Sequence, residues 1–225
     1  MTPIASRYEA VRRQVFDAAD VSGRGPEDVT IVVVTKTVGI SEIRLAMTAG
    51  ARDFGENRVQ EFLGKYGLFP DVNWHFIGSL QTNKVKDVVG RACLIHSVDS
   101  LHLLREIDLR ARQADTVQPV LLQVNVSGEA TKHGFECDDV RDILVEVSSM
   151  PHVEVRGLMT MAPFGRAEDA RWVFRQLREL RDSLREMPLN GVELTELSMG
   201  MSNDFKVAVE EGATIVRVGG AIFGK

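Results

Sequence analysis

The amino-acid sequence predicts an α/β protein that folds as a single (β/α)8 TIM barrel with an extra N-terminal helix. Eight short apolar segments alternate with amphipathic segments at a spacing of roughly 25 residues, which is typical of parallel βα units. No GxGxxG motif follows the first strand, so an open dinucleotide-binding sheet is the less favoured arrangement. No linker or change of composition interrupts the pattern, and we expect one domain over residues 1–225.

The N-terminal helix is indicated by apolar residues at helical spacing, namely Ile4, Tyr8, Val11 and Val15. Only residues 221–225 follow the last predicted strand, and this segment is too short for a full helix. We therefore expect the N-terminal helix to cover the place that an eighth helix would take.

The first predicted strand, 31–34, has four consecutive apolar residues and is followed by Lys36. Such a run predicts a strand that is buried on both faces. Desolvation at the end of this strand would lower the pKa of Lys36 and favour the neutral amine that forms a Schiff base. The alternative is that Lys36 simply extends to solvent from the strand end.

The remaining strands and helices follow in alternation along the chain. The other predicted strands are 51–56, 73–78, 92–97, 119–126, 153–159, 193–198 and 214–218. The predicted helices between them are 42–49, 59–66, 83–89, one after the fourth strand, one around 140–147, 173–187 and 204–211. Ser41 is expected to cap the first of these helices, and Asp99 or Ser100 the helix after the fourth strand.

Composition excludes several classes of function. A net charge of -5 and a pI near 5.6 argue against a nucleic-acid-binding protein, because no basic excess is present to neutralise phosphates. No apolar run approaches the ~18 residues of a membrane span, so we expect a soluble protein that does not bind membranes. Cys93 and Cys137 form no CxxC motif, and no signal peptide is evident at the N-terminus. We expect a cytoplasmic protein in which both cysteines are core thiols and no metal is bound.

In a barrel of this kind, polar residues at the C-terminal ends of the strands converge on one opening, where chemistry takes place. A single residue of this kind more often has a structural role, as the end of a strand or a helix cap, than a role in binding. The prediction of a site therefore depends on several such residues meeting at one opening. The residues expected around this opening are Lys36, Glu56, Asn57, His75, Gly78, Ser97, Asn125, Met159, Ser198, Met199, Ser202, Arg217, Gly219 and Gly220.

The segments after the seventh and eighth strands have the composition of a phosphate site. Barrels commonly bind phosphate there through glycine amides and hydroxyl groups. Ser198 and Ser202 supply hydroxyls, and Gly219 and Gly220 allow backbone N–H groups to approach an anion closely. A phosphate site beside a lysine suggests a phosphorylated aldehyde cofactor. The alternative is that the glycine pair forms a tight turn that closes the barrel.

Eight sequence blocks, which span nearly the whole chain, resemble the pyridoxal-phosphate homeostasis protein family. This family is also called the proline synthetase co-transcribed protein family, and it has the alanine racemase-like barrel known as fold type III. The matching blocks are VVVTKTVG at 32–39, FGENRVQE at 54–61, WHFIGSLQTNK at 74–84, HSVDS at 96–100, QVNVSGEATKHGF at 123–135, RGLMTMAP at 156–163, LSMGMSNDF at 197–205 and VRVGGAIFG at 216–224.

The resemblance implies that Lys36 forms an internal aldimine, a Schiff base, with pyridoxal 5'-phosphate. Ser202, Gly219 and Gly220 fall where the family holds the phosphate, and Arg217 falls where it faces the pyridine nitrogen. Asn57 and His75 would line the pocket near the ring. Gly220 departs from the family pattern, because family members usually have threonine there. The side-chain hydroxyl with which that threonine would bind the phosphate is therefore missing.

Three functions are compatible with these residues. The first is a protein that binds pyridoxal phosphate for vitamin B6 homeostasis without a dedicated substrate reaction, because a guanidinium donor at the ring nitrogen weakens the cofactor as an electron sink. The second is an amino-acid racemase, which needs a second base on the opposite face of the substrate. In the related alanine racemases this base is a tyrosine from an extra β domain, whereas this chain has 225 residues and its two tyrosines, Tyr8 and Tyr66, lie on predicted helices away from the opening. The third is an aldolase that uses Lys36 on a sugar phosphate.

The resemblance also implies partners. Pyridoxal phosphate is the expected ligand, and apo forms of pyridoxal-phosphate enzymes are candidate recipients of it. We expect a monomer, with a weak dimer as the alternative.

Overall fold

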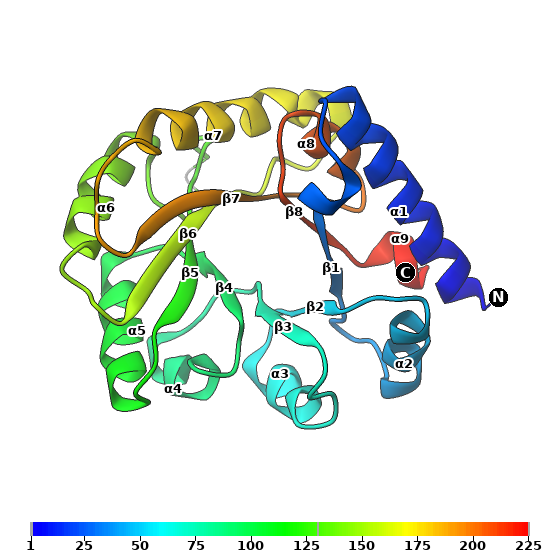
Figure 1. Ribbon diagram of the computed structural model, residues 1–225, viewed down its shortest axis with the longest axis horizontal. Helices are drawn as coiled ribbons and strands as arrows, with labels where there is room; N and C mark the ends of the chain where they lie inside the picture. Colours follow the sequence, from blue (N-terminus) through cyan, green and yellow to red (C-terminus); the bar gives the residue numbers. More distant parts are fainter. Residues whose placement is uncertain (1, 130, 225) are drawn as a thin grey trace.

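Eight parallel strands form a closed barrel in the computed structural model, which describes residues 2–129 and 131–224. The strands pair in chain order from β1 to β8, and β8 pairs with β1 to close the barrel (Figure 1). The predicted barrel is therefore confirmed. The strands are β1 (Thr30–Val34), β2 (Asp53–Glu56), β3 (Asn73–Phe76), β4 (Leu94–Val98), β5 (Gln118–Gln123), β6 (Val153–Met159), β7 (Val192–Met201) and β8 (Ile215–Val218).

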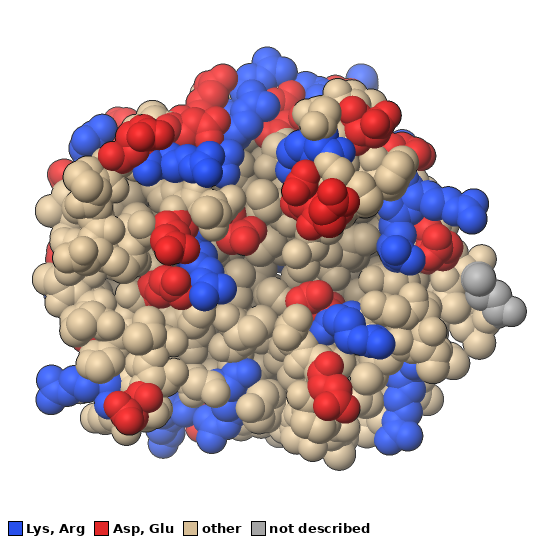
Figure 2. All heavy atoms as spheres, viewed as in Figure 1, with Lys and Arg blue, Asp and Glu red and all other residues tan. Residues whose placement is uncertain are grey.

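Helices surround the barrel and alternate with the strands (Figure 1). They are α1 (Pro3–Val21), α2 (Ile40–Thr48), α3 (Val59–Tyr66), α4 (Val85–Val88), α5 (Leu101–Gln113), α6 (Val140–Val147), α7 (Arg171–Leu184), α8 (Phe205–Glu210) and α9 (Gly220–Phe223). No helix in the described part of the chain is long and apolar enough to cross a membrane. Figure 2 shows basic and acidic side chains interspersed on the face that it presents, without a continuous basic surface.

The N-terminal helix covers the place of an eighth helix, as predicted. The last helix, α9, has four residues, and α1 packs beside α8 and α9 (Figure 1). The apolar face of α1 is buried, including Tyr8, Val11 and Val15. Arg24 fixes the chain after α1, because its guanidinium donates hydrogen bonds to the carbonyls of Val209 and Ala213 at 2.5 and 2.8 Å.

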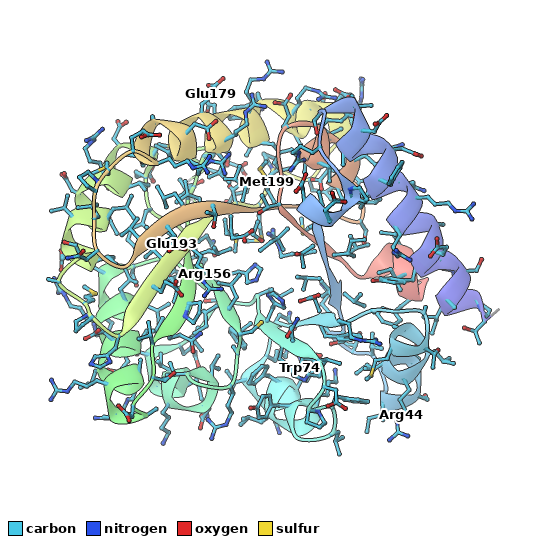
Figure 3. The ribbon with its side chains drawn as sticks, in the orientation of Figure 1. Arg44, Trp74, Arg156, Glu179, Glu193 and Met199 are labelled. Atoms are coloured by element: carbon cyan, nitrogen blue, oxygen red, sulfur yellow. The ribbon has the colours of Figure 1, made fainter. Side chains whose placement is uncertain are left out.

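Strand alternation divides the buried residues into two layers. Residues on the outer face of the barrel, such as Phe54 and Trp74, pack against the helices, and Figure 3 shows Trp74 beside α3. A small apolar cluster fills part of the interior and contains Val32, Leu94, Leu121, Met159 and Ile215. The rest of the interior is lined by polar residues, and these lie beneath the candidate site.

Two local expectations were wrong. Helix α2 begins at Ile40 and not after Ser41, because Gly39 is its N-cap and donates its N–H to the Glu42 carboxylate at 2.9 Å. Cys93 is exposed and Cys137 is half-buried, so neither is a core thiol. Cys93 directly precedes β4, whereas Cys137 begins a short 3-10 helix before α6 and packs, partly buried, against the edge of the core. The cap of α5 is Ser100, whose hydroxyl accepts from the N–H of Leu103 at 3.3 Å.

Candidate functional site

A cavity of about 530 Å³ opens at the C-terminal end of the strands. Its volume lies within the usual range for small-molecule sites. Seven of the predicted residues line it, namely Lys36, Asn57, Gly78, Ser202, Arg217, Gly219 and Gly220. A larger hollow of about 740 Å³ lies at the opposite end of β6 and β7, beside Glu193 (Figure 3), and contains none of the predicted residues. The chemistry of the linings, and not their size, therefore identifies the site.

The turn after β8 provides a small cradle of backbone amides. The hydroxyl of Ser202 accepts hydrogen bonds from the N–H groups of Gly219 and Ala221, at 3.3 and 3.2 Å. A Cβ on Gly219 would lie 3.1 Å from both the Cβ and the carbonyl oxygen of Val34, so a side chain there would require β1 and the turn after β8 to separate by a few tenths of an ångström. Gly220 begins α9 and does not have a positive φ. Glycine is thus needed at 219 for close packing, whereas nothing in the backbone angle requires it at 220.

Lys36 lies beyond the end of β1 and lines the cavity, but its side chain is exposed. Of the two alternatives for Lys36, the structure therefore shows the lysine that extends to solvent and not the desolvated amine. The burial ends at Thr35, and the chain then turns at Thr37, which has a φ of 59°. A positive φ is uncommon for a β-branched residue, so surrounding contacts must hold this turn.

Those contacts come from a buried ion pair between β2 and α3. The ammonium of Lys65 lies 2.5 Å from Oε1 of Glu56 and donates to the carbonyl oxygen of Thr35 at 2.8 Å. The Thr35 hydroxyl donates to the same Glu56 oxygen at 2.6 Å. On the other side of the lysine, the Thr37 N–H donates to Glu61 at 3.1 Å. The two residues that flank Lys36 are therefore fixed, and sequence analysis missed the role of Lys65.

Arg217 is a buried cation at the floor of the cavity. Its Nη1 donates to the Ser198 hydroxyl at 2.6 Å, and its Nη2 donates to the carbonyl oxygen of Thr160 at 3.0 Å. Burial lowers the pKa of Arg217 to about 10, and the charge of Asp204 opposes that effect. The side chain stays protonated at neutral pH and presents a fixed positive charge to the cavity.

Two histidines lie below Arg217 inside the barrel. His96 Nδ1 is 2.8 Å from the Ser198 hydroxyl, and its Nε2 is 3.0 Å from Nδ1 of His75. His75 Nε2 is 3.1 Å from the Asp53 carboxylate, which lies at the start of β2. His75 and Ser198 therefore do not line the cavity but belong to a polar chain beneath it. Sequence analysis missed Asp53 and His96, although His96 begins the HSVDS block.

Three more predicted residues, Ser97, Met159 and Met199, lie off the cavity wall. The Ser97 hydroxyl donates to the carbonyl oxygen of Gly78, which itself lines the cavity. Met159 is in the apolar cluster of the barrel interior. Met199 is buried on the helix side of β7 (Figure 3). The structure thus gathers seven predicted residues around one opening and places His75, Ser97, Met159, Ser198 and Met199 behind them.

The lining fits a small phosphorylated aldehyde. It combines the amine of Lys36, the Arg217 cation, and the hydroxyl and amides around Ser202. In addition, Oδ1 of Asn57 is buried and has no hydrogen-bond partner within the described chain. A buried polar atom without a partner is costly, and a polar ligand at the adjoining wall would reduce this cost.

Fold and lining together define a barrel of the alanine racemase type, and comparison with known proteins agrees. Residues 8–225 match the family described as alanine racemase, N-terminal domain. The pyridoxal phosphate homeostasis protein of Aquifex aeolicus is 46% identical over 97% of this chain and 96% of its own. The chain belongs to the pyridoxal phosphate homeostasis protein family.

Solved structures with a similar fold agree with this assignment. PipY of Synechococcus elongatus PCC7942, solved with PLP bound, has a TM-score of 0.84 and 37% identity, and the match covers 98% of this chain and 100% of PipY. Alanine racemase of Corynebacterium glutamicum has a TM-score of 0.71 at 15% identity, and the match covers 98% of this chain and 60% of the racemase. The second likeness shows the shared barrel alone.

Proposed function

We propose that this protein binds pyridoxal 5'-phosphate through Lys36 and serves the intracellular homeostasis of vitamin B6. The observation that carries the proposal is that Lys36, Arg217 and the Ser202 cradle line one cavity. The relatives named above are homeostasis proteins, and PipY was solved with PLP bound. Pyridoxal phosphate supplies an aldehyde that condenses reversibly with a lysine amine and a ring that can delocalise electrons.

Each lining group has a separate role in this proposal. Ser202, Gly219 and Gly220 hold the phosphate with a hydroxyl and backbone amides, and Asn57 contacts the cofactor near its ring. Arg217 faces the ring nitrogen. A guanidinium has only donors, so it cannot accept a hydrogen bond from a protonated ring nitrogen and keeps that nitrogen unprotonated. This limits electron withdrawal by the ring and supports a carrier without a dedicated substrate reaction.

The exposure of Lys36 supports reversible loading. The amine is exposed at the cavity opening, and Phe164 at the rim is fully exposed. A bound cofactor at this position stays accessible to solvent and to other proteins. The recipients that we propose are apo forms of pyridoxal-phosphate enzymes in the cytoplasm, and the proposed state of the chain is a monomer, with a weak dimer as the alternative.

The racemase alternative is not favoured. A racemase needs a second base on the other face of the substrate, and neither of the two tyrosines of this chain provides it. Tyr8 is buried in α1, and Tyr66 stacks on Phe62 at a centroid distance of 5.7 Å. Neither tyrosine lines the cavity.

The test is the visible absorption spectrum on addition of pyridoxal phosphate to the purified protein. We expect a yellow, lysine-linked absorbance that borohydride bleaches, that Lys36→Ala abolishes and that Lys206→Ala, on the exposed side of α8, leaves unchanged. Equal absorbance in Lys36→Ala and the wild type would refute the proposed attachment. A panel of free amino acids that leaves the spectrum unchanged would agree with a carrier, whereas steady turnover of one of them would favour an enzyme.

A further inference from the structure

A continuous chain of hydrogen bonds crosses the barrel interior beneath the cavity. It consists of Asp53, His75, His96, Ser198 and Arg217, and we call it the relay. Four contacts of 2.6 to 3.1 Å connect its members in that order. Its two ends reach different surfaces, because Arg217 lines the cavity at the C-terminal end, whereas Asp53 lines a separate hollow beside α1. The three middle residues are at most 5% exposed.

The donors and acceptors of these five residues allow the hydrogen bonds of the relay only two arrangements. Arg217 has donors only, so Ser198 Oγ always accepts from it. With both histidines neutral, the Ser198 hydroxyl donates to His96 Nδ1, His96 Nε2–H donates to His75 Nδ1, and His75 Nε2–H donates to Asp53. Every contact then holds one proton, and all the bonds run from Arg217 towards Asp53.

One additional proton on His75 reverses the middle of the relay. His75 then donates from both ring nitrogens, so His96 must accept at Nε2 and carry its own proton on Nδ1. His96 Nδ1–H donates to Ser198, whose oxygen accepts from both His96 and Arg217. The Ser198 hydroxyl hydrogen is thereby released from His96. The imidazoles need not move, because only the protons change place.

Three titratable groups face His75. They are Asp53 from β2, Cys93 from the residue before β4, and His96 from β4 itself. Burial lowers the pKa of His75, but its interactions with Asp53 and Cys93 outweigh burial and raise the pKa to about 9. Burial and the charges of His75 and Arg217 hold the pKa of His96 well below its usual value, so His96 stays neutral.

We propose that Asp53, His75 and His96 are positioning residues for Arg217, and that protonation of His75 sets the direction of the relay and the positive potential at the cavity floor. The proton exchanges with solvent through Asp53, whose side chain is 26% exposed, at the end of the barrel away from the cavity. The strength with which the cavity holds an anionic ligand therefore depends on a group that the ligand does not touch.

The direction of the relay can be tested by NMR on the full-length chain labelled with 15N-histidine, before any cofactor is added. We expect His96 to carry its proton on Nδ1 at neutral pH and on Nε2 after His75 titrates near pH 9. His102→Gln, on the exposed face of α5, removes one signal for assignment and leaves the others in place. If His96 keeps its proton on the same nitrogen across the titration, the proposal is overturned.

The effect on the cavity rests on the proposed function and has its own measurement, the dissociation constant for pyridoxal phosphate. At neutral pH we expect His75→Gln to weaken binding by about fivefold, and His102→Gln to leave it unchanged. Above pH about 9 the difference between His75→Gln and the wild type should disappear, because His75 of the wild type is then uncharged, like the glutamine that replaces it. A difference that persists at high pH would show a merely structural effect of the substitution. The NMR result is independent of whether Lys36 binds the cofactor, so the two proposals fail separately.

Discussion

Removal of the Ser202 hydroxyl is expected to weaken cofactor binding strongly while changing stability little. The hydroxyl accepts two amide hydrogen bonds of 3.3 and 3.2 Å, which are long, and its own proton is available to a phosphate oxygen. Loss of two weak bonds at a half-buried position should lower the free energy of unfolding by about 1 kcal/mol. Loss of a hydrogen bond to a charged group costs about 1.5–3 kcal/mol, which corresponds to an increase of the dissociation constant by about 10- to 150-fold.

The assay is a titration of the wild type, Ser202→Ala and Ser183→Ala with pyridoxal phosphate, followed by absorbance. Ser183 is an exposed residue of α7 whose hydroxyl donates to the carbonyl oxygen of Leu180, so it is a matched hydroxyl deletion far from the cavity. We expect only Ser202→Ala to lose affinity. If its dissociation constant equals that of the wild type, the phosphate is held elsewhere and the assignment of the cradle fails.

Three further predictions concern the neighbouring residues. Gly220→Thr should tighten cofactor binding by about tenfold through an additional hydroxyl, since position 220 has no positive φ to exclude a β-branched residue; weaker binding in this variant would mean that the site has no room for the hydroxyl. Lys65→Met should destabilise the fold by about 3–5 kcal/mol in urea unfolding, because it leaves the fully buried Glu56 carboxylate unpaired; a loss no larger than that of Lys86→Met on α4 would refute this. Because the pKa of His75 is raised to about 9 from 6.5, protonated His75 and its partners Asp53 and Cys93 should contribute up to about 3 kcal/mol of stability that is fully present below pH about 6.5 and is lost as the pH rises through about 9. A difference in the free energy of unfolding between His75→Gln and the wild type that stays constant across this pH range would contradict it.

The fold could be predicted from the sequence because it depends on short-range periodicity. Continuous apolar runs such as residues 31–34 and the helical spacing of Tyr8, Val11 and Val15 are properties of single segments, and the closed barrel follows from their number and order. The seven cavity residues could be predicted for a related reason. They follow strand ends, and the parallel arrangement brings all strand ends to one face.

The polar interior could not be predicted in the same way. His96 and Ser198 are 102 residues apart in the chain and come together only through the strand register, which the sequence does not specify. Lys65 resembles any surface residue of an amphipathic helix, and its burial against Glu56 depends on the angle at which α3 packs on β2. The sequence left open whether Lys36 is exposed, because it does not specify that burial along β1 ends at Thr35 or that the chain then turns at Thr37. The predicted contacts of Met159 and Met199 with a cofactor stay predictions.

Attachment of pyridoxal phosphate to Lys36 is the central claim, and peptide mapping after borohydride reduction of the loaded protein tests it most directly. Reduction fixes the cofactor to the lysine that holds it, and mass spectrometry of the digested chain identifies that residue. We predict that the modified peptide contains Lys36 and that the yield falls in Ser202→Ala at limiting cofactor. Modification at Lys65, Lys84 or Lys206 with Lys36 unmodified would contradict the account.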